Sequence, residues 1–318
     1  MALLTFAIFD LSDFFDSIFD FDEIDALSDQ FDTLGYGSFY VYLNLGNIVI
    51  TAFFPFMIWI ILYFVAKYLY QKWQPYYENL TKKLYFNHII KFIHETYFLL
   101  AMSAAINLHY AYWNSFGNAS NMIMSIVIIM VVVAFPVFVG VMYSDKKNLA
   151  LIRDRERSGK LFMQKYGDII LPYHTHRRGA KVVTVLYFEM IRKIWLVCTL
   201  VYMQKYALYS LIMVNFQVLM IIFVIAEAEP YHKSSDTHLD LFNEFSTLVV
   251  NYHLMLFTEF VPDVDTRERI GTSLIAFTCG NLGVNFGIIL RNSLNLFYNT
   301  MKLRYSRYKL LKAAKEKS

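Results

Sequence analysis

Long apolar runs alternate with short polar segments along this chain. A membrane-spanning helix needs about 20 mostly apolar residues, and seven segments meet that requirement. They cover about 48–68, 95–113, 122–143, 182–203, 206–226, 239–261 and 270–290. The predicted fold class is all-α: a polytopic transmembrane helix bundle of about seven spans.

The charges between these runs alternate in sign. Residues 1–65 contain no Lys or Arg but many Asp, whereas the loop 145–181 and the tail 302–318 are rich in Lys and Arg. Basic loops stay on the cytoplasmic side of a membrane. We therefore expect the N-terminus outside and the C-terminus inside, which agrees with an odd number of crossings.

Three regions follow from this topology. Residues 1–40 form an acidic extracytoplasmic arm, 41–295 the transmembrane domain with an inner loop at 144–181, and 296–318 a basic cytoplasmic tail. The arm has an amphipathic pattern, and its apolar face should lie against the outer leaflet, its own spans or a neighbouring subunit. That face comprises Phe14, Phe15, Ile18, Phe19, Ile24, Leu27 and Phe31.

Composition narrows the possible functions. The chain is 57% hydrophobic with a net charge of only +3, so its polarised charges indicate membrane topology rather than nucleic-acid binding. The sequence contains no phosphate-binding loop, nucleophile elbow or Cys/His metal spacing. We expect a non-enzymatic protein without metal or cofactor, with bound membrane lipids and further copies of itself as partners.

Ionisable and amide side chains inside the predicted spans are the candidate functional residues, because such groups are costly in a bilayer. Two spans hold them. The group in 182–203 is either an internal ion pair that holds its helix in place or a charge site that lines a pathway or senses voltage, and the group in 239–261 is either an interhelical contact or a hydrated path. The set is Glu189, Arg192 and Lys193 in 182–203, and Asn243, Glu244, Asn251 and His253 in 239–261.

Other candidate positions serve packing, lipid contact and modification. Gly280, Gly283 and Gly287 allow close helix packing within or between subunits. Anionic lipid headgroups are the expected partners of Arg153, Arg155, Arg157, Arg177 and Arg178. Asn118 begins a glycosylation sequon in a predicted outer turn. The amphipathic segment 84–95 is either interfacial or part of the second span.

Several short motifs carry a family resemblance. They are Leu34-Gly35-Tyr36 with Asn44-Leu45-Gly46, Phe188-Glu189 with Arg192-Lys193, Glu229-Pro230, and Leu241-Phe242-Asn243-Glu244. Together they resemble the membrane region of large cysteine-rich surface proteins of ciliates, which is distantly similar to transient-receptor-potential and polycystin channels. The resemblance implies the plasma membrane of a protist, although an organelle membrane stays an alternative. The cysteine-rich ectodomain of that family is absent from this sequence.

We expect a structural or scaffold component of a membrane assembly that acts by self-association. The first alternative is a channel or transporter subunit, although the outer turns are too short for a re-entrant pore segment. The second is a seven-helix receptor, although the last span lacks an Asn-Pro-x-x-Tyr motif.

Overall fold

The computed structural model describes residues 12–19, 21, 26–69, 73–83, 87–154, 158–171, 173, 180–258 and 261–315. Within these ranges the side chains of 12–14, 47, 49–55, 69, 79–80, 82–83, 180 and 306–315 are not described. By internal contacts the chain divides into two compact units, Met1–Leu241 and Phe242–Ser318.

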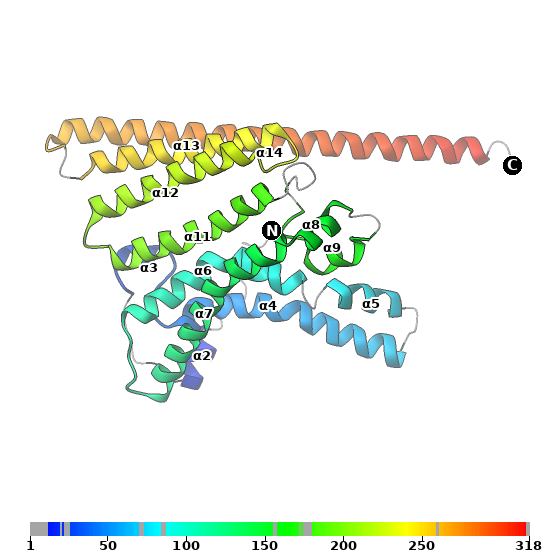
Figure 1. Ribbon diagram of the computed structural model, residues 1–318, viewed down its shortest axis with the longest axis horizontal. Coiled ribbons are helices and arrows are strands. Elements are labelled where there is room, and N and C mark those ends of the chain that lie inside the picture. The colour runs from blue at the N-terminus through cyan, green and yellow to red at the C-terminus, as the bar shows by residue number, and fades with distance from the viewer. Residues whose placement is uncertain are drawn as a thin grey trace. The chain divides into compact units, whose positions relative to one another are not determined.

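The described chain is helical, and Figure 1 shows its helices in order. They are α2 (Ser12–Phe19), α3 (Asp29–Thr33), α4 (Val41–Phe64) with a π-helical turn (Val65–Leu69), α5 (Gln74–Lys83), α6 (Ile89–His109), α7 (Phe116–Ser144), α8 (Lys146–Arg153), α9 (Lys160–Tyr166), α11 (Ala180–Tyr202), α12 (Ala207–Ala228), α13 (Ser234–Leu256) and α14 (Val264–Lys315). The described residues form no strand, only one isolated antiparallel bridge between Tyr173 and Tyr231. The all-α prediction is confirmed.

Four helices are long and apolar enough to cross a membrane. They are α6, α7, α12 and the Val264–Tyr305 part of α14. The other three predicted spans also coincide with helices, namely α4, α11 and α13. Charged residues within α11 and α13 lower their apolar character. The described apolar segment that begins in α4 and continues into the π-helical turn, Phe56–Tyr68, is shorter than a span. The structure supports several membrane helices but does not establish seven crossings or their direction.

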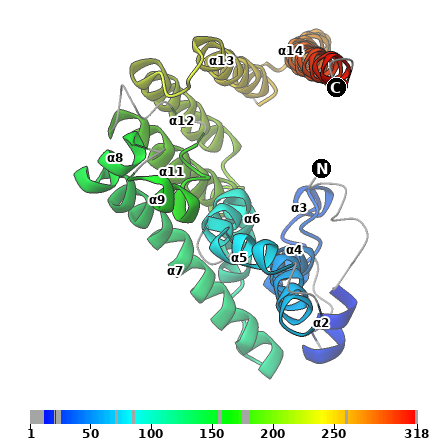
Figure 2. The same ribbon diagram turned by 90° about the vertical axis from the view of Figure 1, so that its right-hand side faces the viewer.

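Helix α6 is central to the first unit. It packs against α4, α7 and α11, and α12 packs against α11, as Figures 1 and 2 show. Fully buried side chains from three of these helices form the core: Tyr97, Met102 and Ile106 of α6, Val139 of α7, and Leu186 and Met190 of α11. A central helix is apolar on several faces because each face meets a neighbour.

The described part of the acidic arm packs against its own chain. The Phe19 ring stacks on Tyr42 of α4 with ring centroids 4.9 Å apart, and Phe21 stacks on Tyr40 at 4.1 Å. Phe31 is buried in the same core. Of the predicted apolar face, Phe15, Phe19, Leu27 and Phe31 thus pack against the core of their own chain, whereas Ile18 is 55% exposed. Phe14 and Ile24 lie outside the side chains that the structure describes.

The second unit contains the end of α13 and all of α14, which run antiparallel. Asn243 lies opposite Asn285, and ten residues further along α13 His253 lies opposite Ser273. The His253 ring also stacks on Phe277, with ring centroids 6.5 Å apart. Partly buried positions of α14 recur every three or four residues as far as Ile288, whereas all residues from 291 to 305 are exposed.

The expected boundary at 295/296 between membrane domain and tail falls inside α14, which continues through it without a break. The described residues of the segment 84–95 belong to α6 and the turn that leads into it. Residues 89–95 of the amphipathic segment and residues 95–109 of the predicted second span therefore belong to one helix.

Candidate functional site

Two loops far apart in sequence meet in the first unit through a pair of tyrosines. Tyr173 precedes α11 and Tyr231 precedes α13, and their backbones form the isolated antiparallel bridge. Their rings stack with centroids 5.6 Å apart and planes 18° apart. This pair fixes the loop after α9 against the loop after α12.

Each tyrosine hydroxyl points to a carboxylate. Tyr231 Oη donates a hydrogen bond of 3.1 Å to Asp240 Oδ2, and Tyr173 Oη donates to Glu189 Oε2 over a longer 3.5 Å. Asp240 lies on α13 and Glu189 on α11. We call these four residues the tyrosine–carboxylate cluster; it connects two helices and two loops within the first unit.

The electrostatics of the cluster keep both phenols protonated. Burial raises the pKa of Tyr173, and the nearby Glu189 carboxylate raises it further. Burial likewise raises the pKa of Tyr231, with Asp240 as the next cause. A phenol that stays neutral remains a hydrogen-bond donor to a carboxylate over the physiological pH range.

Cationic side chains lie one helical turn from Glu189 on α11. Arg192 and Lys193 are partly buried, as is Glu189 itself, and positions three and four residues apart share a helix face. The predicted Glu189–Arg192–Lys193 group is therefore extended by the two tyrosines and Asp240. The arrangement provides charge compensation for Glu189 and a polar connection between α11 and the two loops.

Tyr173, Tyr231 and Asp240 were not among the site residues predicted from the sequence. The sequence contains a pattern that indicates contact between the two loops, because the tripeptide Pro-Tyr-His occurs twice, at 172–174 and at 230–232. Both copies lie in loops on the predicted cytoplasmic side. A repeated aromatic motif at two loops on one side of a membrane favours contact between the loops, and the structure pairs the two tyrosines.

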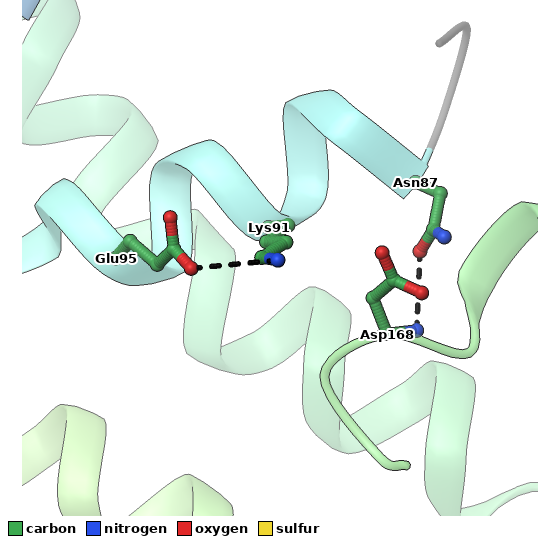
Figure 3. Close-up of polar contacts among 4 residues, drawn as sticks. All are labelled: Asn87, Lys91, Glu95 and Asp168. Atoms are coloured by element: carbon green, nitrogen blue, oxygen red, sulfur yellow. Dashed lines mark hydrogen bonds and ion pairs between the residues drawn. The ribbon is translucent and has the colours of Figure 1, made fainter. Parts of the chain in front are cut away.

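The start of α6 makes a second polar contact with the inner loop (Figure 3). Asn87 Oδ1 accepts a hydrogen bond of 3.1 Å from the backbone N–H of Asp168, while Lys91 and Glu95 form an i, i+4 ion pair of 3.7 Å. Both members of the ion pair are about half exposed or more, so it contributes at most a few tenths of a kcal/mol. Asn87 is the residue that attaches the loop.

The predicted intramembrane network is divided between the two units. Glu189, Arg192 and Lys193 lie in the first unit, whereas Asn243, Glu244, Asn251 and His253 lie in the second. In the second unit Asn285 Nδ2 donates to Asn243 Oδ1 at 2.7 Å, and Asn243 Nδ2 donates to Asn285 Oδ1 at 3.2 Å. This reciprocal amide pair joins α13 to α14, as expected for an interhelical contact.

Within the second unit, α13 does not reach the three glycines of α14. A Cβ added to Gly280, Gly283 or Gly287 would have no atom within 4 Å. Packing of these glycines against α13 is therefore not observed, and a contact between subunits stays a prediction.

The predicted headgroup contacts and the glycosylation sequon lie in different environments. Arg153 is exposed in the last turn of α8, where a lipid headgroup could reach it. Four further predicted headgroup contacts lie outside the described residues: Arg155, Arg157, Arg177 and Arg178. Asn118 is only 3% exposed in the first turn of α7, so its side chain lacks the room that a glycan requires. The buried position argues against use of this sequon.

Among the described residues, no group of three or more His, Cys, Asp or Glu side chains could hold a metal ion. Comparisons with known proteins gave no match: no protein-family model, curated protein or solved structure is significantly similar to this chain. The resemblance to ciliate surface proteins therefore stays an expectation.

Proposed function

We propose that this chain is a seven-helix integral membrane protein, with its N-terminus outside and its C-terminus inside, that acts as a structural component by self-association. The membrane would be the plasma membrane of a protist. Lipids and further copies of the chain are its partners, and no reaction is assigned to it.

The observation that carries the proposal is a face of α14 that α13 leaves exposed within the second unit. This small-residue face is formed by Ala276, Gly280, Gly283 and Gly287, and α13 does not reach its glycines. Membrane helices associate through van der Waals packing, and small residues let their backbones approach closely. A second copy would cover a surface that α13 leaves exposed.

The native mass of the full chain in lipid nanodiscs or a mild detergent tests this proposal. We expect a defined mass above the 37.4 kDa of one chain. Gly283→Leu with Gly287→Leu should lower that mass, while Val284→Leu, an enlargement on another exposed side of α14, should not. A single-chain mass for the unmodified protein would refute self-association.

The charged group on α11 favours a second candidate, a channel or transporter subunit. Glu189, Arg192 and Lys193 lie in a helix proposed to cross the membrane, and the tyrosine–carboxylate cluster extends the polar surface to the start of α13. Ionisable groups inside membrane proteins often line ion or proton pathways.

Ion flux into liposomes containing the purified protein separates the two candidates. A pathway along α11 predicts flux that Glu189→Gln changes, whereas Glu227→Gln, at an exposed carboxylate, serves as control. Glu244→Gln tests the part of the predicted network in the second unit. Liposomes that stay silent at every pH and voltage would remove the channel candidate and leave the structural one.

A further inference from the structure

Helix α14 is much longer than a bilayer requires. Its 52 residues correspond to about 78 Å at 1.5 Å per residue, whereas the hydrocarbon core is about 30 Å thick. If residues 270–290 cross the membrane, residues 291–315 project beyond it as one continuous helix. This projecting part still carries large apolar side chains, among them Leu296 and Leu303.

A heptad pattern runs along one side of α14. Isoleucine or leucine occurs at every seventh position, at Ile275, Leu282, Ile289, Leu296 and Leu303, and each of these side chains is 63–69% exposed. Asparagine occurs at every seventh position on the adjacent row, at Asn285, Asn292 and Asn299. A spacing of four and three between the rows is the spacing of the core positions of a coiled coil.

One asparagine of this row already forms hydrogen bonds between two helices of the chain. Asn285 forms the reciprocal amide pair with Asn243 across the α13–α14 interface. Asn292 and Asn299 follow on the same row, beyond the last position of α14 that α13 partly buries, and both are exposed. The projecting part of α14 thus continues the row of an interhelical asparagine beyond the last partly buried position of the helix.

We propose that a second copy of this chain packs along this face, parallel and in register, so that Leu296 and Leu303 meet their counterparts and Asn292 and Asn299 pair with the same residues of that copy. We call residues Ile289, Asn292, Leu296, Asn299 and Leu303 the leucine–asparagine face. The inference rests on the self-association proposed above. At 3.6 residues per turn this face lies on the side of α14 opposite Gly283 and Gly287, so it provides a second contact between copies, outside the membrane.

Two arguments favour a second copy over another partner. Copies inserted in one membrane share their orientation, so their α14 helices run parallel. In a parallel pair of identical helices, each core residue meets its own counterpart, and paired asparagines fix that register because an asparagine opposite a leucine would lose its hydrogen bond. Lys302 and Arg304 lie close to this face, so repulsion between copies should make the association stronger at higher salt.

Paired charge variants of the full chain test the face. Leu296→Glu with Leu303→Glu should reduce the native mass, because four carboxylates would meet in the core of each pair. Leu294→Glu with Met301→Glu introduces the same charges at the same spacing on the opposite side of the helix and should leave the mass unchanged. The reverse result would overturn the assigned face.

A cysteine variant tests register directly, without relying on a destabilised protein. In a background with Cys198→Ala and Cys279→Ala, Leu303→Cys should cross-link two copies through a disulfide when a mild oxidant is added, since counterparts in a parallel pair face each other. Met301→Cys, on the opposite side, should not cross-link.

The outcomes distinguish a failure of the leucine–asparagine face from a failure of self-association as a whole. A single-chain mass for the unmodified protein would remove both. If the oligomer persists in Leu296→Glu with Leu303→Glu and Leu303→Cys gives no cross-link, self-association stands but the leucine–asparagine face does not mediate it. Contact of that face with a lipid surface would give this second result.

Discussion

The hydroxyl of Tyr97 donates a hydrogen bond of 2.6 Å to the carbonyl oxygen of Val132. In an α-helix this oxygen would accept from the N–H of residue 136, but residue 136 is a proline and has no N–H. Both Tyr97 and Val132 are fully buried. A side chain of α6 thus satisfies the acceptor that Pro136 leaves open in α7.

Tyr97→Phe should therefore destabilise the protein by about 1 kcal/mol, because it leaves a buried carbonyl without a partner. Pro136→Ala restores the helical donor, so the penalty of Tyr97→Phe should shrink in the double variant. Unfolding of all three variants in detergent, followed by circular dichroism, measures this coupling. Equal penalties in both backgrounds would contradict it.

Two equally buried serines should respond differently to replacement by alanine. Ser125 Oγ donates to Asn107 Oδ1 at 2.7 Å, whereas Ser103 Oγ is buried without a hydrogen-bond partner in the described chain. Ser125→Ala should cost about 1 kcal/mol and Ser103→Ala close to nothing, since only the first leaves a buried acceptor unpaired. Thermal unfolding of the two variants gives the comparison, and a larger loss for Ser103→Ala would refute this account.

Gly117→Ala should release the acidic arm. A Cβ at this position would lie 2.5 Å from the carbonyl oxygen of Phe19, a backbone atom that cannot move without displacing the arm. We expect limited proteolysis within residues 12–33 to become several-fold faster. Gly140→Ala is the control, because its Cβ would meet nothing closer than a Tyr187 ring atom at 3.7 Å. Unchanged cleavage in Gly117→Ala would show that the arm is held elsewhere.

Stability should fall at alkaline pH through Tyr36. Burial raises the pKa of Tyr36 to about 12, above the value of about 10 expected in the unfolded chain. Between these two values the unfolded chain loses the proton while the folded chain keeps it, so the contribution of Tyr36 is complete below pH 10 and is lost as the pH rises to 12. Tyr36→Phe should flatten this dependence in unfolding measurements; an equally steep fall in the variant would assign it to other tyrosines.

The lengths of the apolar runs predicted where the long helices lie in the sequence. All seven predicted spans coincide with helices because an apolar run of that length is satisfied only by helical hydrogen bonding or deep burial. Spacing also placed Glu189, Arg192 and Lys193 on one face of α11. The pairings of Tyr173 with Tyr231 and of Asn107 with Ser125 could not be read from periodicity, because they join residues distant in sequence. The arm pattern of Phe19 and Phe31 predicted an apolar face but not which surface covers it.

The first turn of α4 depends on a residue that follows it by 80 positions. The backbone N–H of Val41, one of the donors that a helix start leaves open, is bonded to Asn121 Oδ1 of α7 at 2.9 Å. During synthesis α4 emerges well before α7, so the order of assembly is constrained. The beginning of α4 completes its hydrogen bonding only after α5, α6 and the start of α7 have been made. The biogenesis of this protein should therefore proceed by joint maturation of α4, α6 and α7 rather than by helices that finish one at a time.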